Sequence, residues 1–268
     1  MGYFLENLTW PRAEKAFKET KFAVVPTGSC EQHGPHLPIG TDYFTAKEIA
    51  SRVVDRSPVV ATPTMPIGYA DYHADFPGTL SLTEETMASV YKDLCSHLIN
   101  YGVEHIVFVN GHGGNLGPLT STMSWLRDKN ILAATIMWYE VCGDLNEEWK
   151  AIGHGDFIET SLVLAINEEG VDLSKANVPE RINLTDELVL NDIRDCRFKG
   201  APVHVGLRTR DYTETGDMIE FGHNPDVDHS IPPTKGSSER GEEILEAVAE
   251  YISDFIEEFK SASIPFKR

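Results

Sequence analysis

The feature that most constrains the fold is a repeated alternation of short apolar runs with longer stretches of helical periodicity. The apolar runs are rich in β-branched residues and lie at 22–28, 58–63, 104–110 and 132–138. Helical patterns fall between and after them, at about 43–54, 83–101, 115–129, 156–169 and 238–260. Apolar strands that alternate with helices are typical of a parallel sheet covered on both faces. The sequence therefore predicts an α/β fold.

Composition adds little to this and excludes some organisations. With 41% hydrophobic and 24% charged residues, the chain is typical of a globular protein. It contains no repeat, linker or low-complexity stretch, so we expect residues 1–268 to form a single domain. Residues 203–223 are expected to form a hairpin or an irregular excursion.

Charge and cysteine usage indicate the compartment and exclude two classes of partner. The chain has 42 acidic and 23 basic residues, a formal charge of −19. Proteins that bind nucleic acid need a basic face, so neither nucleic acid nor an anionic membrane is an expected partner. No apolar run approaches the roughly 18 residues that span a membrane, and the N-terminus lacks a signal pattern. The four cysteines lie far apart, which predicts a reducing, cytoplasmic location.

The densest group of chemically active residues follows the first predicted strand. Glu31, His33 and Asp42 offer one nitrogen and two carboxylates, a ligand mix that Zn, Mn or Fe(II) accepts. Residues two apart in extended backbone point the same way, so Glu31 and His33 can converge, and Asp42 at the next helix start can bridge two ions. The alternative is a loop salt bridge beside a helix cap at Asp42.

A glycine-rich loop at 110–115 follows the third predicted strand and surrounds His112 with Gly111, Gly113 and Gly114. Glycines let the backbone approach a ligand closely, although such loops also cradle phosphates. Loops at the carboxyl ends of parallel strands meet in one crevice. We therefore expect His112 near the first group.

A third group, at 153–161, opens a predicted helix. Asp156 suits the positive end of that helix as a cap. Glu159 lies in an otherwise apolar turn, where a carboxylate is costly unless it is paired or bound to metal. The alternative for Glu159 is a surface position. Together with His154, the three loops favour a metal site.

These segments resemble the creatininase family, the creatinine amidohydrolases. The matching pieces run in family order and cover about residues 20–170: Gly28–Pro38 with Asp42, Phe76–Ser81, Asn110–Asn115, and Glu159–Ser161 five residues after His154. The resemblance implies a three-layer α/β/α domain with a mainly parallel central sheet. It also implies a site for two divalent metal ions in each subunit.

The resemblance implies how the ligands divide. Glu31, Asp42 and His112 would hold one ion, and His33 and Asp42 the other. Creatininase has a glutamate where this chain has Gly114, so either Glu159 or a water completes the second site.

The implied chemistry is attack on a carbonyl by a water activated between two Zn, Mn or Fe ions. His154 matches a histidine beside the substrate and is our candidate to protonate the leaving nitrogen, with Glu159 as the other catalytic candidate. The candidates for substrate contact are His73, Gly113, Gly114, Trp138 and Asp156. Alternatives are that His73 is bonded to loop backbone and that Trp138 is a core aromatic.

We expect hydrolysis of an amide C–N bond in a small, cyclic substrate, and Gly114 argues against creatinine itself. One alternative is a different carbonyl-activated bond: a formamide, a peptide, or a C–C bond of a cyclic keto-polyol. Another is a non-catalytic metal- or ligand-binding protein. The family's ring-like homo-oligomers, often hexamers, imply the same assembly here.

Overall fold

The computed structural model describes residues 1–150, 153–177, 183–191, 193–217 and 231–264. Its centre is a parallel sheet of five strands in the order β1-β3-β2-β4-β5. The strands are β1 (Tyr3–Phe4), β2 (Phe22–Thr27), β3 (Val60–Ala61), β4 (His105–Asn110) and β5 (Leu132–Met137).

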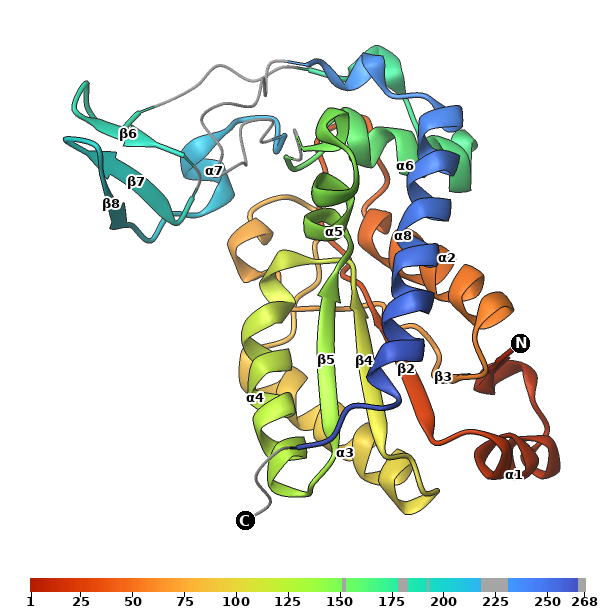
Figure 1. The fold of residues 1–268 in the computed structure, drawn as a ribbon. Coiled ribbons are helices and arrows are strands. Elements are labelled where there is room, and N and C mark those ends of the chain that lie inside the picture. Colours follow the sequence, from red (N-terminus) through yellow and green to blue (C-terminus); the bar gives the residue numbers. More distant parts are fainter. Residues whose placement is uncertain (151–152, 178–182, 192, 218–230, 265–268) are drawn as a thin grey trace.

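Helices cover both faces of this sheet (Figure 1). One layer is formed by α2 (Thr41–Arg56), α5 (Trp138–Leu145), α6 (Phe157–Asn167) and α8 (Ser238–Phe259). The other is formed by α1 (Trp10–Glu19), α3 (Glu84–Asn100) and α4 (Leu116–Asp128). The three-layer α/β/α architecture predicted from the sequence is confirmed.

Burial on both faces explains why the strands read as continuous apolar runs. In β2, Val24 packs into the core beneath α2 and α8, while its neighbours Ala23 and Val25 pack into the core beneath α3 and α4. Successive side chains of a strand point to opposite faces, so both faces need apolar residues. The α3 helix begins where its cap predicts, because the Thr83 hydroxyl accepts a hydrogen bond from the Thr86 N–H.

The structure shifts some predicted boundaries. The strand expected at 132–138 ends at Met137, and Trp138 begins α5, which was not predicted. The α1 helix was not predicted either. The hairpin considered for 203–223 lies earlier, in β7 (Asp195–Phe198) and β8 (Ala201–His204), while residues 218–223 of that range lie outside the described residues.

A second, antiparallel sheet consists of β6 (Leu188–Leu190), β7 and β8. It stands away from the central sheet in Figure 1. Its small core includes Leu190, Ile193 and the α7 (Thr209–Tyr212) residue Tyr212, and Tyr72 from the main body packs against it. Among the described helices, none combines the length and apolar character required to cross a bilayer.

Candidate metal centre

The strand-end loops meet because the three central strands end at one level. Thr27 of β2 pairs with Asn110 of β4, and Asn110 pairs with Met137 of β5. The segments that follow β2 and β4 leave the sheet together, and the loop before α6 reaches the same edge. The convergence predicted from the alternating pattern is present.

Asp42, in the first turn of α2, lies between two histidines. Its Oδ1 is 3.1 Å from Nε2 of His33, and its Oδ2 is 3.2 Å from Nδ1 of His112. The Ser29 hydroxyl donates to Oδ2 over 2.7 Å. Asp42 does not cap its helix, since Gly40 occupies the cap position. Its two oxygens face two different places, as those of a bridging carboxylate do.

A further carboxylate stands on each side. Glu31 Oε1 is 3.1 Å from His112 Nδ1, and Glu159 Oε2 is 3.7 Å from His33 Nε2. Glu159 is only 6% exposed, so a surface position for it is excluded. Three groups among the described residues have ligand atoms within 4.8 Å of one another: Glu31, Asp42 and His112; His33, His154 and Glu159; and Glu31, His73 and His154.

The outward nitrogens of the two central histidines donate to backbone carbonyls. His112 Nε2 is 2.8 Å from the Tyr69 carbonyl oxygen, and His33 Nδ1 is 3.2 Å from that of Glu31. Each ring then directs its other nitrogen inward, toward the carboxylates. A histidine that binds a metal usually donates its other N–H in this way.

The buried charges of this cluster perturb one another strongly. Burial raises the pKa of Glu31, and it raises the pKa of Glu159 to about 8. Burial opposes ionisation of His33, but the nearby Asp42 and Glu159 carboxylates outweigh it and raise its pKa to about 10. His33 and His112 in turn hold the pKa of Asp42 well below its ordinary value against the effect of burial.

The residues fit divalent ions on a further observation. Among the described residues, neither carboxylate oxygen of Glu31 has a hydrogen-bond donor of good geometry, although both are buried. Such a group costs free energy unless a cation compensates it. Imidazole and carboxylate donors are those that Zn, Mn and Fe accept. In this structure the carboxylates are compensated by protons that they share with the histidines. Bound cations would supply that positive charge instead.

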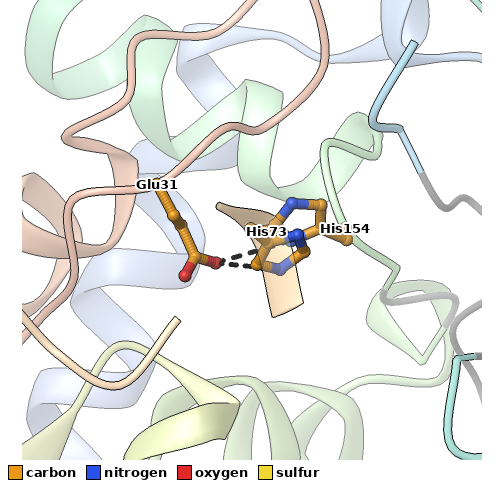
Figure 2. Close-up of side chains that lie close together, drawn as sticks. All are labelled: Glu31, His73 and His154. Carbon is orange, nitrogen blue, oxygen red and sulfur yellow. Dashed lines mark ion pairs between the residues drawn. The ribbon is translucent and has the colours of Figure 1, made fainter. Parts of the chain in front are cut away.

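His73 and His154 face the Glu31 carboxylate (Figure 2). Nε2 of His73 is 3.5 Å, and Nδ1 of His154 3.9 Å, from Oε1 of Glu31. Burial lowers the pKa of both imidazoles well below the ordinary value. His73 is bonded to side chains of Gln32 and Thr209, which differs from the alternative of a histidine bonded to loop backbone.

Asp156 and Trp138 occupy supporting positions. Asp156 is fully buried and caps α6, with Oδ1 accepting from the Glu159 N–H and Oδ2 from the Gly153 N–H. Trp138 is 1% exposed within the apolar core, and its indole N–H donates to the Gly111 carbonyl. We therefore assign Asp156 to the placement of Glu159, and Trp138 to support of the loop that carries His112, in place of substrate contact.

A cavity of about 600 Å³ borders the cluster. Tyr72, Gly113 and Gly114 line it, together with Ile193, Arg194 and Leu207, which lie in and after the second sheet. The Tyr72 hydroxyl lies 3.1 Å from Nε2 of His112. The two glycines that directly follow His112 thus line this cavity.

Gly114→Ala is expected to displace His112 and lower the bound metal, whereas Gly113→Ala should not. An added Cβ at Gly114 would lie 2.5 Å from His112 Nε2 and closer still to the Tyr69 carbonyl. At Gly113 it would meet the Tyr139 hydroxyl at 3.3 Å and nothing nearer. Metal analysis of both variants tests this, and equal metal content in the two would contradict it.

Sequence reasoning missed Gln32, Tyr72 and Thr209. Gln32 lies between two proposed ligands, and its position in the 28–38 motif was the one available signal. Thr209 lies 136 positions from His73, which its hydroxyl contacts, and no local pattern marks it.

The fold and site define an α/β protein with a candidate centre for two divalent ions. The chain belongs to the creatininase family, because the family model for creatinine amidohydrolase matches residues 6–256. The mycofactocin precursor peptide peptidase of Mycolicibacterium smegmatis is 35% identical over 179 residues, which cover 62% of this chain and 61% of that protein. The chain therefore spans about six tenths of that relative's length.

Two further similarities cover nearly the whole chain. The 3-dehydro-scyllo-inosose hydrolase of Thermotoga maritima is 25% identical, over 98% of this chain and 87% of that protein. A solved structure named Creatininase Mn superposes with a TM-score of 0.74 at 22% identity, over 98% of this chain and 100% of that one. This last likeness shows the fold alone.

Proposed function

We propose that this chain is a metal-dependent amidohydrolase with two divalent ions, Zn, Mn or Fe, in each subunit. The observation that carries the proposal is the Asp42 carboxylate, whose two oxygens face His33 and His112 separately. Glu31 would complete the first ligand set and Glu159 the second. When bound, such ions polarise a substrate carbonyl and lower the pKa of the attacking water.

His154 is the proposed proton carrier. Its Nε2 is 2.7 Å from the backbone carbonyl oxygen of Gln32 and donates to it. This leaves Nδ1 unprotonated and directed at the cluster. Nδ1 would take a proton from the attacking water and return it to the leaving nitrogen. The amide and one water then give a carboxylic acid and an amine.

The proposed substrate is a small, cyclic amide other than creatinine. A second candidate, an amide bond within a peptide, is favoured by the cavity beside Gly113 and Gly114. Its volume of about 600 Å³ exceeds what one small ring fills, and it extends to Ile193, Arg194 and Leu207. The similarity to a peptide peptidase supports the same candidate.

Metal analysis combined with a hydrolysis screen tests these proposals. The purified protein would be loaded with Zn, Mn or Fe(II) and offered lactams, formamides, short peptides and cyclic diketones. Lactam cleavage supports the first candidate and peptide cleavage the second. Turnover of formamides or diketones alone would replace both with another carbonyl-activated bond. Metal binding without any turnover would favour a non-catalytic protein.

Glu159→Gln is expected to lower the occupancy of one ion and leave the other. The amide is a weaker ligand, and Glu159 contacts the His33 side of the cluster only. Metal-to-protein ratios measured by mass spectrometry would fall from two toward one. Glu168→Gln, just beyond the same helix, is the matched exposed control. An unchanged metal-to-protein ratio in Glu159→Gln would favour water as the ligand that completes the second site.

The proposal extends to the whole chain and its setting. We propose that residues 1–268 act as one domain, supported by Tyr72 and Thr209, which join the excursion to the site. A cytoplasmic location is supported by four free cysteines. A homo-oligomer, with the hexamer as the expected form, is supported by the family alone.

A further inference from the structure

Three imidazole rings form a stack at the edge of the candidate centre. The ring of His154 lies between those of His33 and His73, with centroid distances of 4.3 and 4.5 Å. The two rings outside our assigned ligand set, His73 and His154, share the neighbour Gln32. The hydrogen bonds around Gln32 decide which nitrogen of each ring carries the proton.

The orientation of the Gln32 amide is fixed by backbone groups. Its Oε1 accepts from the Gly34 N–H over 2.9 Å, and its Nε2 donates to the Gly216 carbonyl over 3.0 Å. Gly216 has a φ of +94° and brings its backbone too close to the glutamine to leave room for a Cβ. One N–H of the amide therefore remains for a histidine.

That N–H is directed to His73. Nε2 of His154 already donates to the backbone carbonyl oxygen of Gln32, so it cannot accept from the side-chain amide. Nδ1 of His73 lies 3.0 Å from Gln32 Nε2 and 2.6 Å from the Thr209 hydroxyl. The amide nitrogen of Gln32 can only donate, so Nδ1 of His73 must be the unprotonated nitrogen, and the Thr209 hydroxyl then donates to it as well.

The two rings thus share the Nε2–H tautomer but turn different nitrogens toward Glu31. His73 carries its proton on Nε2, which faces Glu31 Oε1 at 3.5 Å, while His154 turns a bare Nδ1 toward the same oxygen at 3.9 Å. One ring offers a donor and the other an acceptor to one side of the cluster (Figure 2).

We propose that Gln32 and Thr209 are positioning residues that hold His73 as a hydrogen-bond donor and His154 as an acceptor. The catalytic meaning rests on the proposed function: the His73 N–H would stabilise negative charge on the substrate oxygen while His154 takes the proton of water. A histidine held in the wrong tautomer cannot perform its role, whatever its position.

Nitrogen NMR of the zinc-loaded, ¹⁵N-histidine-labelled protein tests this directly. We expect both His73 and His154 to carry a proton on Nε2 and none on Nδ1. The protonated nitrogen of His73 and the unprotonated nitrogen of His154 then face the cluster. A His73 proton on Nδ1 in the unsubstituted protein would overturn the inference.

Substitutions identify the residues that set these states. Gln32→Glu keeps an acceptor for the Gly34 N–H but loses the donor to His73, so the His73 proton should leave Nε2 for Nδ1. Thr209→Val removes the second donor and should populate both tautomers, and Thr209→Ser should retain the original one. Thr122→Val removes a buried hydroxyl that donates to Pro118 outside the site, and should change nothing.

If the His73 tautomer is unchanged in Gln32→Glu, the role of Gln32 is refuted. If it is unchanged in Thr209→Val, the role of Thr209 is refuted. Because the readout is a proton position, its outcome is separate from activity. Correct tautomers without any hydrolysis would count against the proposed function, and hydrolysis with reversed tautomers against this inference.

Discussion

Replacing Asp42 by asparagine is expected to yield a protein that holds neither ion and does not hydrolyse any substrate. In the part of the chain that the structure describes, Asp42 is the one side chain that contacts both inner histidine nitrogens, with 3.1 and 3.2 Å separations. An amide is neutral and offers one oxygen, so it cannot bridge two cations. Metal-to-protein ratios by mass spectrometry, together with assay of any substrate found in the screen, measure both effects.

The matched control for Asp42 lies on the same helix. Asp55→Asn changes an exposed carboxylate of α2 and should keep both ions. His112→Ala should give an intermediate result, because it removes a ligand of the first set only. A full metal complement in Asp42→Asn would show that the two ligand sets are not joined by this residue.

Replacing His154 by glutamine is expected to slow turnover by about 10²–10⁴-fold and to leave the metal content unchanged, since that is the typical contribution of a general acid or base. Glutamine retains an N–H for the backbone carbonyl oxygen of Gln32. In the unsubstituted protein this oxygen accepts from the His154 Nε2–H over 2.7 Å. It removes the basic nitrogen directed at the cluster. The measurement is kcat alongside the metal-to-protein ratio.

His154 also lies within reach of His33 and Glu159, so the same variant separates two roles. Loss of one ion would make His154 a ligand and remove it as the proton carrier. His97→Gln, an exposed change on α3, controls for the substitution itself. Normal turnover in His154→Gln would exclude both roles.

Much of the fold was predictable because burial imposes a periodicity that local sequence records. The apolar runs became β2, β3, β4 and β5, and the helical patterns became α2, α3, α4, α6 and α8 with small boundary shifts. Trp138 shows the limit of this reasoning. Its apolar neighbours extend the strand pattern by one residue, yet the backbone turns there into α5.

The candidate site was predictable in its members and less so in its geometry. Glu31, His33, Asp42 and His112 follow strands whose ends must converge, and the structure brings them together. Asp156 could be read either as a cap or as a substrate contact. Its two backbone hydrogen bonds assign it to the cap, because both oxygens are then occupied.

Sequence alone determined the layered α/β fold, the family, and the residue types at the strand ends, because these depend on periodicity and short motifs. Tertiary structure decided that Gln32 and Thr209 hold His73, that Gly114 has no room for a side chain, and that Asp42 lies between two histidines. These depend on contacts between segments up to 136 positions apart, whose distances arise only when the chain packs.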